Sequence, residues 1–275
     1  MVEKANSLPG PDDIYREVLS NGITVLSRSN FNSPSVVVSG YFEAGALFDP
    51  DEKLGLAEYT AAALMRSTMN RTFDEVYQAL ESVGASLGFS TGIHKSGFNG
   101  RSLAEDLPLL LELLSEALTM PIFPKGELEK LRAQLLTGLA IRAEDTSDMA
   151  SMIFDQILFK DHPYSRPEDG YPETIQNIKR ADLVKFHRGH YGPRGMVIAI
   201  VGAVEPETAT KHVRRALGGW QVNGQKTPPE LPALKSLKKT ISKHHRIKGK
   251  SQSDLIIGTN GPMRRDPEFM SASIG

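Results

Sequence analysis

The chain has 275 residues, of which 40% are hydrophobic and 24% charged, so it is large enough for one large globular domain or two smaller ones. Its net charge of −1 gives no electrostatic basis for binding nucleic acid or an anionic membrane. The absence of cysteine excludes disulfides and thiolate metal sites. No run approaches ~18 apolar residues and the start lacks an apolar signal region, so we expect a cytoplasmic protein, or a periplasmic one if a signal was removed.

The first half of the chain alternates between strand and helix patterns. Asn21-Gly22 between two alternating runs is a strong hairpin signal, and Thr72 with Glu75 forms a capping box. The expected elements are the hairpin around Asn21-Gly22, a buried strand over 35–42, an alanine- and leucine-rich helix over 54–67, a helix from 72 to 84, and glycine-bearing strands over 85–92 and 95–102.

The second half is richer in helix patterns. A buried strand over 196–202 is the clearest strand of the whole chain. The other expected elements are helices over 106–118, 125–143, 147–159, 182–191 and 205–217, with an exposed loop over 162–173. Strands, hairpins and helix pairs in this order predict an α+β fold with an antiparallel or mixed sheet.

The composition changes after Trp220. Residues 222–240 are polar and contain three prolines, which is typical of a linker. A new strand is expected over 252–258, with too few residues after it for an independent core. The expected organisation is a flexible leader over 1–13, a domain over 14–221, a linker over 222–240, and the beginning of a truncated second domain over 241–275.

Three patterns offer candidate chemistry. Residues 58 and 62 are four apart on the predicted helix, so their side chains share a face and could meet one ligand. His187 and His190 are one helical turn apart, but no third ligand follows at a recognisable spacing, which favours solvated imidazoles. Lys248-Gly-Lys-Ser lacks the upstream glycine of a phosphate loop.

Several short motifs also occur in a characteristic order between residues 14 and 220. They are Asn21-Gly-Ile-Thr-Val, Glu43-Ala-Gly-Ala, Gly55-Leu-Ala, His162-Pro-Tyr, Asp182-Leu-Val-Lys-Phe and Tyr191-Gly-Pro-Arg-Gly-Met-Val-Ile-Ala-Ile-Val-Gly. Together they resemble the M16 family of zinc metallopeptidases, which includes mitochondrial processing peptidase, the core subunits of the cytochrome bc1 complex and bacterial paired-subunit peptidases. The resemblance implies an M16-type (LuxS/MPP-like) domain, mainly an antiparallel sheet flanked by helices, and the start of a second similar domain.

The resemblance also implies where a zinc site would stand. In active members His-x-x-Glu-His follows Gly-Leu-Ala, and a glutamate about eighty residues later completes the site. The corresponding residues here are Glu58, Ala61, Ala62 and Gly138. Alanine and glycine offer no side-chain donor, and a zinc site needs three protein ligands. We therefore expect no catalytic residue, no metal ligand and no cofactor at these degenerate positions.

Three functions follow as hypotheses. The first is a non-catalytic subunit that pairs with an active His-x-x-Glu-His subunit, or with a second copy, to form a chamber for extended polypeptides. The second is a structural scaffold subunit like the bc1 core proteins. The third is an active peptidase with an atypical metal site that uses Glu58 and His94. A peptide could add to the edge of the strand over 85–91, so the candidate substrate-binding residues are Ala85, Leu87, Gly88 and Phe89.

Overall fold

The structure is a computed structural model that describes residues 10–274, and it contains two compact units. Unit 1 consists of the chain up to Leu135 together with Glu168–Pro229, and unit 2 consists of Leu136–Pro167 and the chain from Glu230 onward. Most of the predicted leader, residues 1–9, lies outside the described residues, and Pro11–Asp13 form a 3-10 turn. The boundary after Pro229 falls within the predicted linker over 222–240.

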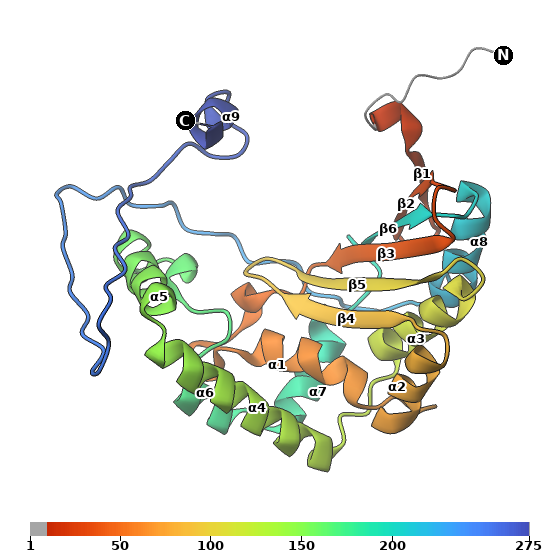
Figure 1. The fold of residues 1–275 in the computed structure, drawn as a ribbon, viewed down its shortest axis with the longest axis horizontal. Helices are drawn as coiled ribbons and strands as arrows, with labels where there is room; N and C mark the ends of the chain where they lie inside the picture. The colour runs from red at the N-terminus through yellow and green to blue at the C-terminus, as the bar shows by residue number, and fades with distance from the viewer. Residues whose placement is uncertain (1–9, 275) are drawn as a thin grey trace. The chain divides into compact units, whose positions relative to one another are not determined.

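A six-stranded mixed sheet forms the centre of unit 1 (Figure 1). Its order is β1-β2-β6-β3-β5-β4, so β1 and β4 are the two edge strands. The β2–β6 ladder is parallel and the other four ladders are antiparallel, which confirms the mainly antiparallel sheet. The strands are β1 (Tyr15–Val18), β2 (Thr24–Ser29), β3 (Ser35–Phe42), β4 (Ser86–Thr91), β5 (Ser96–Leu103) and β6 (Val197–Gly202).

Helices cover one face of this sheet. In Figure 1, α1, α2, α3 and α7 lie on the same side of the strands, where α1 contacts β4 and α3 contacts β5. The helices of unit 1 are α1 (Leu56–Ala63), α2 (Phe73–Ser82), α3 (Leu107–Thr119), the first part of α4 (Lys125–Glu144), α6 (Pro172–Asn177), α7 (Arg180–His190) and α8 (Pro206–Leu217).

The core lies between the sheet and these helices. The side chains of Val36 and Val38 on β3 are fully buried, whereas those of Val37 and Tyr41, at alternate positions of the strand, are 40% and 37% exposed. This is the period of two expected for a strand with one covered face. The leucines of α3 fill the other side of the core because they recur at helical spacing.

Two helices differ from the sequence-based expectation. The helix predicted over 54–67 is shorter, because Gly55 has a left-handed φ of +90° that keeps it outside α1, and the end tightens into a 3-10 turn at Leu64–Arg66. Helix α6 was not predicted, although Pro172 stands at its first turn, where a proline is favourable.

Unit 2 contains the end of α4, α5 (Thr146–Leu158) and α9 (Phe269–Ile274). Asp145 caps α5 by accepting the main-chain N–H groups of Ser147 and Asp148, both at 2.9 Å. The strand predicted over residues 252–258 is wrong, because these residues have no ladder partner among the described strands, and Leu255 is 81% exposed. A strand needs a neighbour to satisfy its main-chain groups, and the remaining described chain supplies none.

Candidate functional site

The start of α1 is fixed by a buried aspartate. The carboxylate of Asp49 accepts the N–H groups of Gly55 and Ala57, both at 2.9 Å, and so satisfies donors that the first helical turn leaves unpaired. A Cβ at Gly55 would lie 2.6 Å from Ile175 and 2.8 Å from the carbonyl oxygen of Asp169. Only glycine fits this left-handed, crowded turn, so the entry into α1 is rigidly placed.

The three residues of α1 that the sequence predicts at the zinc-site positions of the family differ in exposure. Glu58 and Ala62 are half-buried and lie four residues apart on one face, whereas Ala61 is 1% exposed. Burial raises the pKa of Glu58, and the nearby carboxylates of Asp169 and Glu168 raise it further. The pKa of Glu168 is also raised, first by burial and then by Asp169. Glu58 on α1 and the nearby Glu168 therefore keep their protons to a higher pH than ordinary glutamates do.

The side chains at this site do not fit a zinc ion. Within residues 10–274 no group of three or more His, Cys, Asp or Glu side chains is placed to hold a metal, and Ala61 and Ala62 have no donor atoms. His94 is exposed in the turn between β4 and β5, and no metal group includes it with Glu58. These side chains fall short of the three protein donors that a zinc ion requires.

Gly138, which the sequence predicts at the fourth zinc-site position, lies on the part of α4 that belongs to unit 2. It is exposed, and a Cβ added there would meet no atom within 4 Å. The glycine is therefore not required by packing, and larger side chains fit at this position.

The candidate peptide-binding strand β4 stands at the edge of the sheet, as predicted. The N–H of Gly92 donates to the carbonyl oxygen of Lys95 at 2.8 Å, which begins the ladder with β5. Hydrogen-bonded and non-hydrogen-bonded pairs alternate in an antiparallel ladder. By this alternation Leu87 and Phe89 direct their main-chain groups away from β5, toward the free edge, whereas the outward N–H of Thr91 donates to the carboxylate of Glu58.

The residues predicted on this strand have different surroundings. Ala85 precedes β4 and donates its N–H to Leu80 at 2.9 Å, so this group is not available to a peptide. The side chain of Leu87 is buried, and the Phe89 ring lies 6.4 Å from that of Phe98. Gly88 is exposed, and its Cβ would meet no atom within 4 Å. The edge is open because of the strand order, and not because glycine is small.

The free edge of β4 ends beside α1. The hydroxyl of Thr91 donates to the carbonyl oxygen of Ala57 at 3.5 Å and lies 3.1 Å from the hydroxyl of Ser96. Ala57 directly precedes Glu58 in the chain. The sequence did not single out Thr91, Asp49, Glu168 or Asp169. Thr91, Glu168 and Asp169 approach α1 through contacts distant in sequence, and Asp49 does so through a loop that no local motif marks.

The two histidines of α7 are not solvated, which differs from the expectation based on the sequence. The Nε2 atom of His187 lies 2.8 Å from the carbonyl oxygen of Leu118, and burial lowers the pKa of His187. His190 is 6% exposed and packs against the rings of Phe48 and Phe186, and burial lowers its pKa to about 4. Both imidazoles are thus packing groups of the core.

The comparisons with known proteins identify the family to which this fold belongs. Residues 24–167, just over half of the chain, match the family Insulinase (Peptidase family M16), and residues 177–274 match the family Peptidase M16 inactive domain. The chain belongs to the M16 peptidase family.

Similar proteins include both zinc proteases and a respiratory-complex subunit. An uncharacterized zinc protease of Mycobacterium leprae is 27% identical over 216 residues, which cover 78% of this chain and 48% of that protein. Subunit 1 of the mitochondrial cytochrome b-c1 complex of Bos taurus is 24% identical over 275 residues, covering 98% of this chain and 56% of the relative. The chain spans about half the length of these relatives.

Solved structures show the same fold. A peptidase M16 inactive domain from Pseudomonas fluorescens superposes with a TM-score of 0.73 at 24% identity, covering 81% of this chain and 54% of that chain. The periplasmic protease PqqL from Escherichia coli gives a TM-score of 0.76 at 19% identity, covering 83% of this chain and 26% of that chain. No described helix is both long and apolar enough to span a bilayer.

Proposed function

We propose that this chain is a non-catalytic M16 subunit that binds extended polypeptides at the free edge of β4. The observation that carries the proposal is the position of β4 at the sheet edge, next to a family helix without zinc-ligating side chains. Strand addition reads main-chain groups, so it holds polypeptides of varied sequence. The exposed apolar side chains Val37 and Tyr41 on the open face of the sheet add a second surface for such a ligand.

The proposal includes an active partner. Glu58, Ala61 and Ala62 replace the histidine and glutamate side chains of the His-x-x-Glu-His motif. This chain therefore cannot supply the metal-bound water that cleaves a peptide in this family. A partner that carries an intact His-x-x-Glu-His helix would supply this chemistry, while the present chain holds part of the substrate. Self-association would instead give a peptide-binding assembly without peptidase activity.

Amide hydrogen exchange tests binding at the edge. The ¹⁵N-labelled chain is compared with and without an unfolded polypeptide, reduced and carboxymethylated casein. We expect slower exchange at the outward amides of Leu87 and Phe89, by about tenfold or more. The inward amides of Gly88 and Ser90, already paired with β5, and those of β1 at the opposite edge serve as internal controls. Unchanged exchange at Leu87 and Phe89 with saturating polypeptide would contradict edge binding.

Co-expression tests the partner. The chain is produced with an M16 protein that carries the intact zinc motif and is encoded by the same genome. A stable complex whose peptidase activity exceeds that of the partner alone supports the proposed pair. No complex and no change in activity would overturn it.

The second candidate is a scaffold subunit of a larger assembly. It is favoured by the similarity to bovine cytochrome b-c1 subunit 1, which extends over 98% of this chain. A scaffold role predicts a stable assembly in which the amides of Leu87 and Phe89 exchange at the same rate with and without polypeptide. The exchange experiment therefore separates the two functions.

A further inference from the structure

The outer surface of α7 carries a basic groove, which is separate from the edge of β4. A cavity of about 540 Å³ is lined by Arg180, Ala181, Val184, Lys185, Arg188, Gly189 and Lys226. A second hollow of about 270 Å³ adjoins it and shares Arg180, Val184 and Arg188. We call the two together the α7 groove. All of its residues belong to unit 1.

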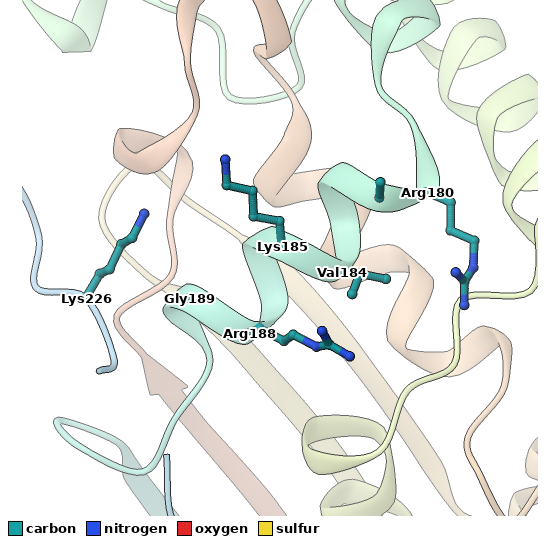
Figure 2. A pocket seen from close by; sticks show the side chains of 7 residues that line it. Arg180, Val184, Lys185, Arg188, Gly189 and Lys226 are labelled. Carbon is teal, nitrogen blue, oxygen red and sulfur yellow. The ribbon is translucent and has the colours of Figure 1, made fainter. Parts of the chain in front are cut away.

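The groove exists because α7 has two different faces. Leu183, Phe186 and His190 are buried, and α7 packs against α1. Arg180, Lys185 and Arg188 are exposed on the helix, and Lys226 approaches from a segment after α8. Three basic side chains of α7 and Lys226 from the separate segment therefore line the same hollow (Figure 2).

These charges are not neutralised within the described chain. Among residues 10–274, the ion pairs include none from Arg180, Lys185, Arg188 or Lys226, and no carboxylate lines either hollow. The guanidinium of Arg180 is held by the carbonyl oxygens of Phe123 at 2.8 Å and Ile122 at 2.9 Å. Arg180 is thus a pre-positioned cation, and the other three are available to a ligand.

The cationic groups are spread along the groove. Figure 2 shows Lys185 and Arg188 leaving the helix in different directions, with Arg180 at the first turn and Lys226 on a separate segment. A site for a single phosphate requires cationic groups that converge on one point, and these four groups do not converge. Ala181, Val184 and Gly189 form an uncharged floor between them. A ligand with several anionic groups, separated by aliphatic parts, fits this arrangement best.

We propose that the α7 groove docks an acidic polypeptide segment of a partner protein, with its carboxylates on Arg188, Lys185 and Lys226 and its aliphatic parts on Val184. Charge complementarity and the small apolar floor carry this assignment. The net charge of −1 gives the chain no overall electrostatic attraction to a nucleic-acid backbone.

Fluorescence anisotropy tests the proposal with the full chain and a labelled ten-residue polyglutamate peptide. We expect saturable binding at low salt that weakens as salt rises, since exposed charges are screened. Lys185→Glu and Arg188→Glu should each weaken binding at least about tenfold, because each replaces an attraction with a repulsion. Lys211→Glu is the matched control, since Lys211 is exposed on α8, outside the groove, and this change alters the net charge equally.

The remaining outcomes would overturn the proposal. They are no binding at low salt, an equal loss in the Lys211→Glu control, or unaltered binding in both groove variants. Oligothymidine, vesicles with phosphatidylserine, and inorganic phosphate are measured in parallel. Tighter Arg188-dependent binding of any of these would assign the groove to that anion instead. Circular dichroism melting of each variant verifies that the protein is folded under the conditions in which weaker binding is measured.

Discussion

The carboxylate of Asp49 accepts the main-chain N–H of Ala57 at 2.9 Å, and a second bond from Gly55 has the same length. These bonds place the first turn of α1 and therefore the position of Glu58. Asp49 is 3% exposed, so its carboxylate has little access to water as an alternative partner. The geometry of the family helix thus depends on a residue outside it.

Replacing Asp49 with alanine should destabilise the fold by about 2–3 kcal/mol, because two buried N–H groups lose a charged acceptor. Chemical denaturation measures this change. Glu52→Ala is the control, since Glu52 is exposed and nearby, and we expect a change within about 0.5 kcal/mol. Equal stability of the two variants would show that Asp49 does not anchor α1.

Glu58→Gln should change how stability depends on pH. The pKa of Glu58 is raised above its ordinary 4.5 by burial, with Asp169 and Glu168 adding to the shift. The folded state therefore binds this proton more tightly than the unfolded chain, and the associated stability is lost as pH rises through the raised value. The glutamine variant, which stays neutral, should melt at a higher temperature than the wild type at about pH 8, with a smaller difference at about pH 4.

Thermal melting across this pH range checks the prediction for Glu58. Glu105→Gln is the matched control because Glu105 is exposed, and its melting curve should follow the wild type at every pH. A Glu58→Gln difference that is constant with pH would mean that Glu58 does not titrate in this range.

His190→Phe should make the protein more resistant to acid. The pKa of His190 is lowered from 6.5 to about 4 by burial, with a smaller contribution from Lys226. Stability linked to the neutral ring is present above pH 6.5 and is lost as pH falls toward 4. Phenylalanine keeps the contacts with Phe48 and Phe186 but cannot be protonated.

The measurement for His190 is the free energy of unfolding at about pH 7 and about pH 5. The loss between the two values should be smaller in the phenylalanine variant than in the wild type. His245→Phe is the control, since His245 is exposed. If the two variants lose the same stability as the wild type, His190 is not buried in its neutral form.

Restoring two imidazoles should give α1 a partial zinc site, with two of the three protein donors that a complete site needs. In the Glu58→His, Ala62→His double variant the two rings lie four residues apart on one face, which suits a shared metal. We expect zinc to raise the melting temperature of this variant. At a free zinc concentration of 100 times the dissociation constant, the free energy of unfolding should rise by about 2.7 kcal/mol. The wild type and the single Ala62→His variant should shift little. An equal shift in the wild type would reveal a metal site elsewhere in the chain.

The sequence by itself determined most of the strands and helices of unit 1 and the family resemblance. Hairpin, strand and helix signals are local, so Asn21-Gly22, the capping box at Thr72 and the leucines of α3 were recognised without a structure. The assignment of residues 58, 61 and 62 to the zinc positions of the family is a prediction that rests on the sequence motif alone. The strand expected over 252–258 failed for the converse reason, since a strand pattern forms no ladder without a neighbour.

Only the tertiary structure decided which surfaces these elements present. Strand order results from pairings between segments far apart in sequence, such as β2 with β6, and this order leaves β4 at the edge. The same long-range packing buries His190, brings Glu168 and Asp169 near Glu58, and places Lys226 beside Gly189 of α7. Burial and charge proximity depend on three-dimensional distance, which the order of residues along one chain does not specify.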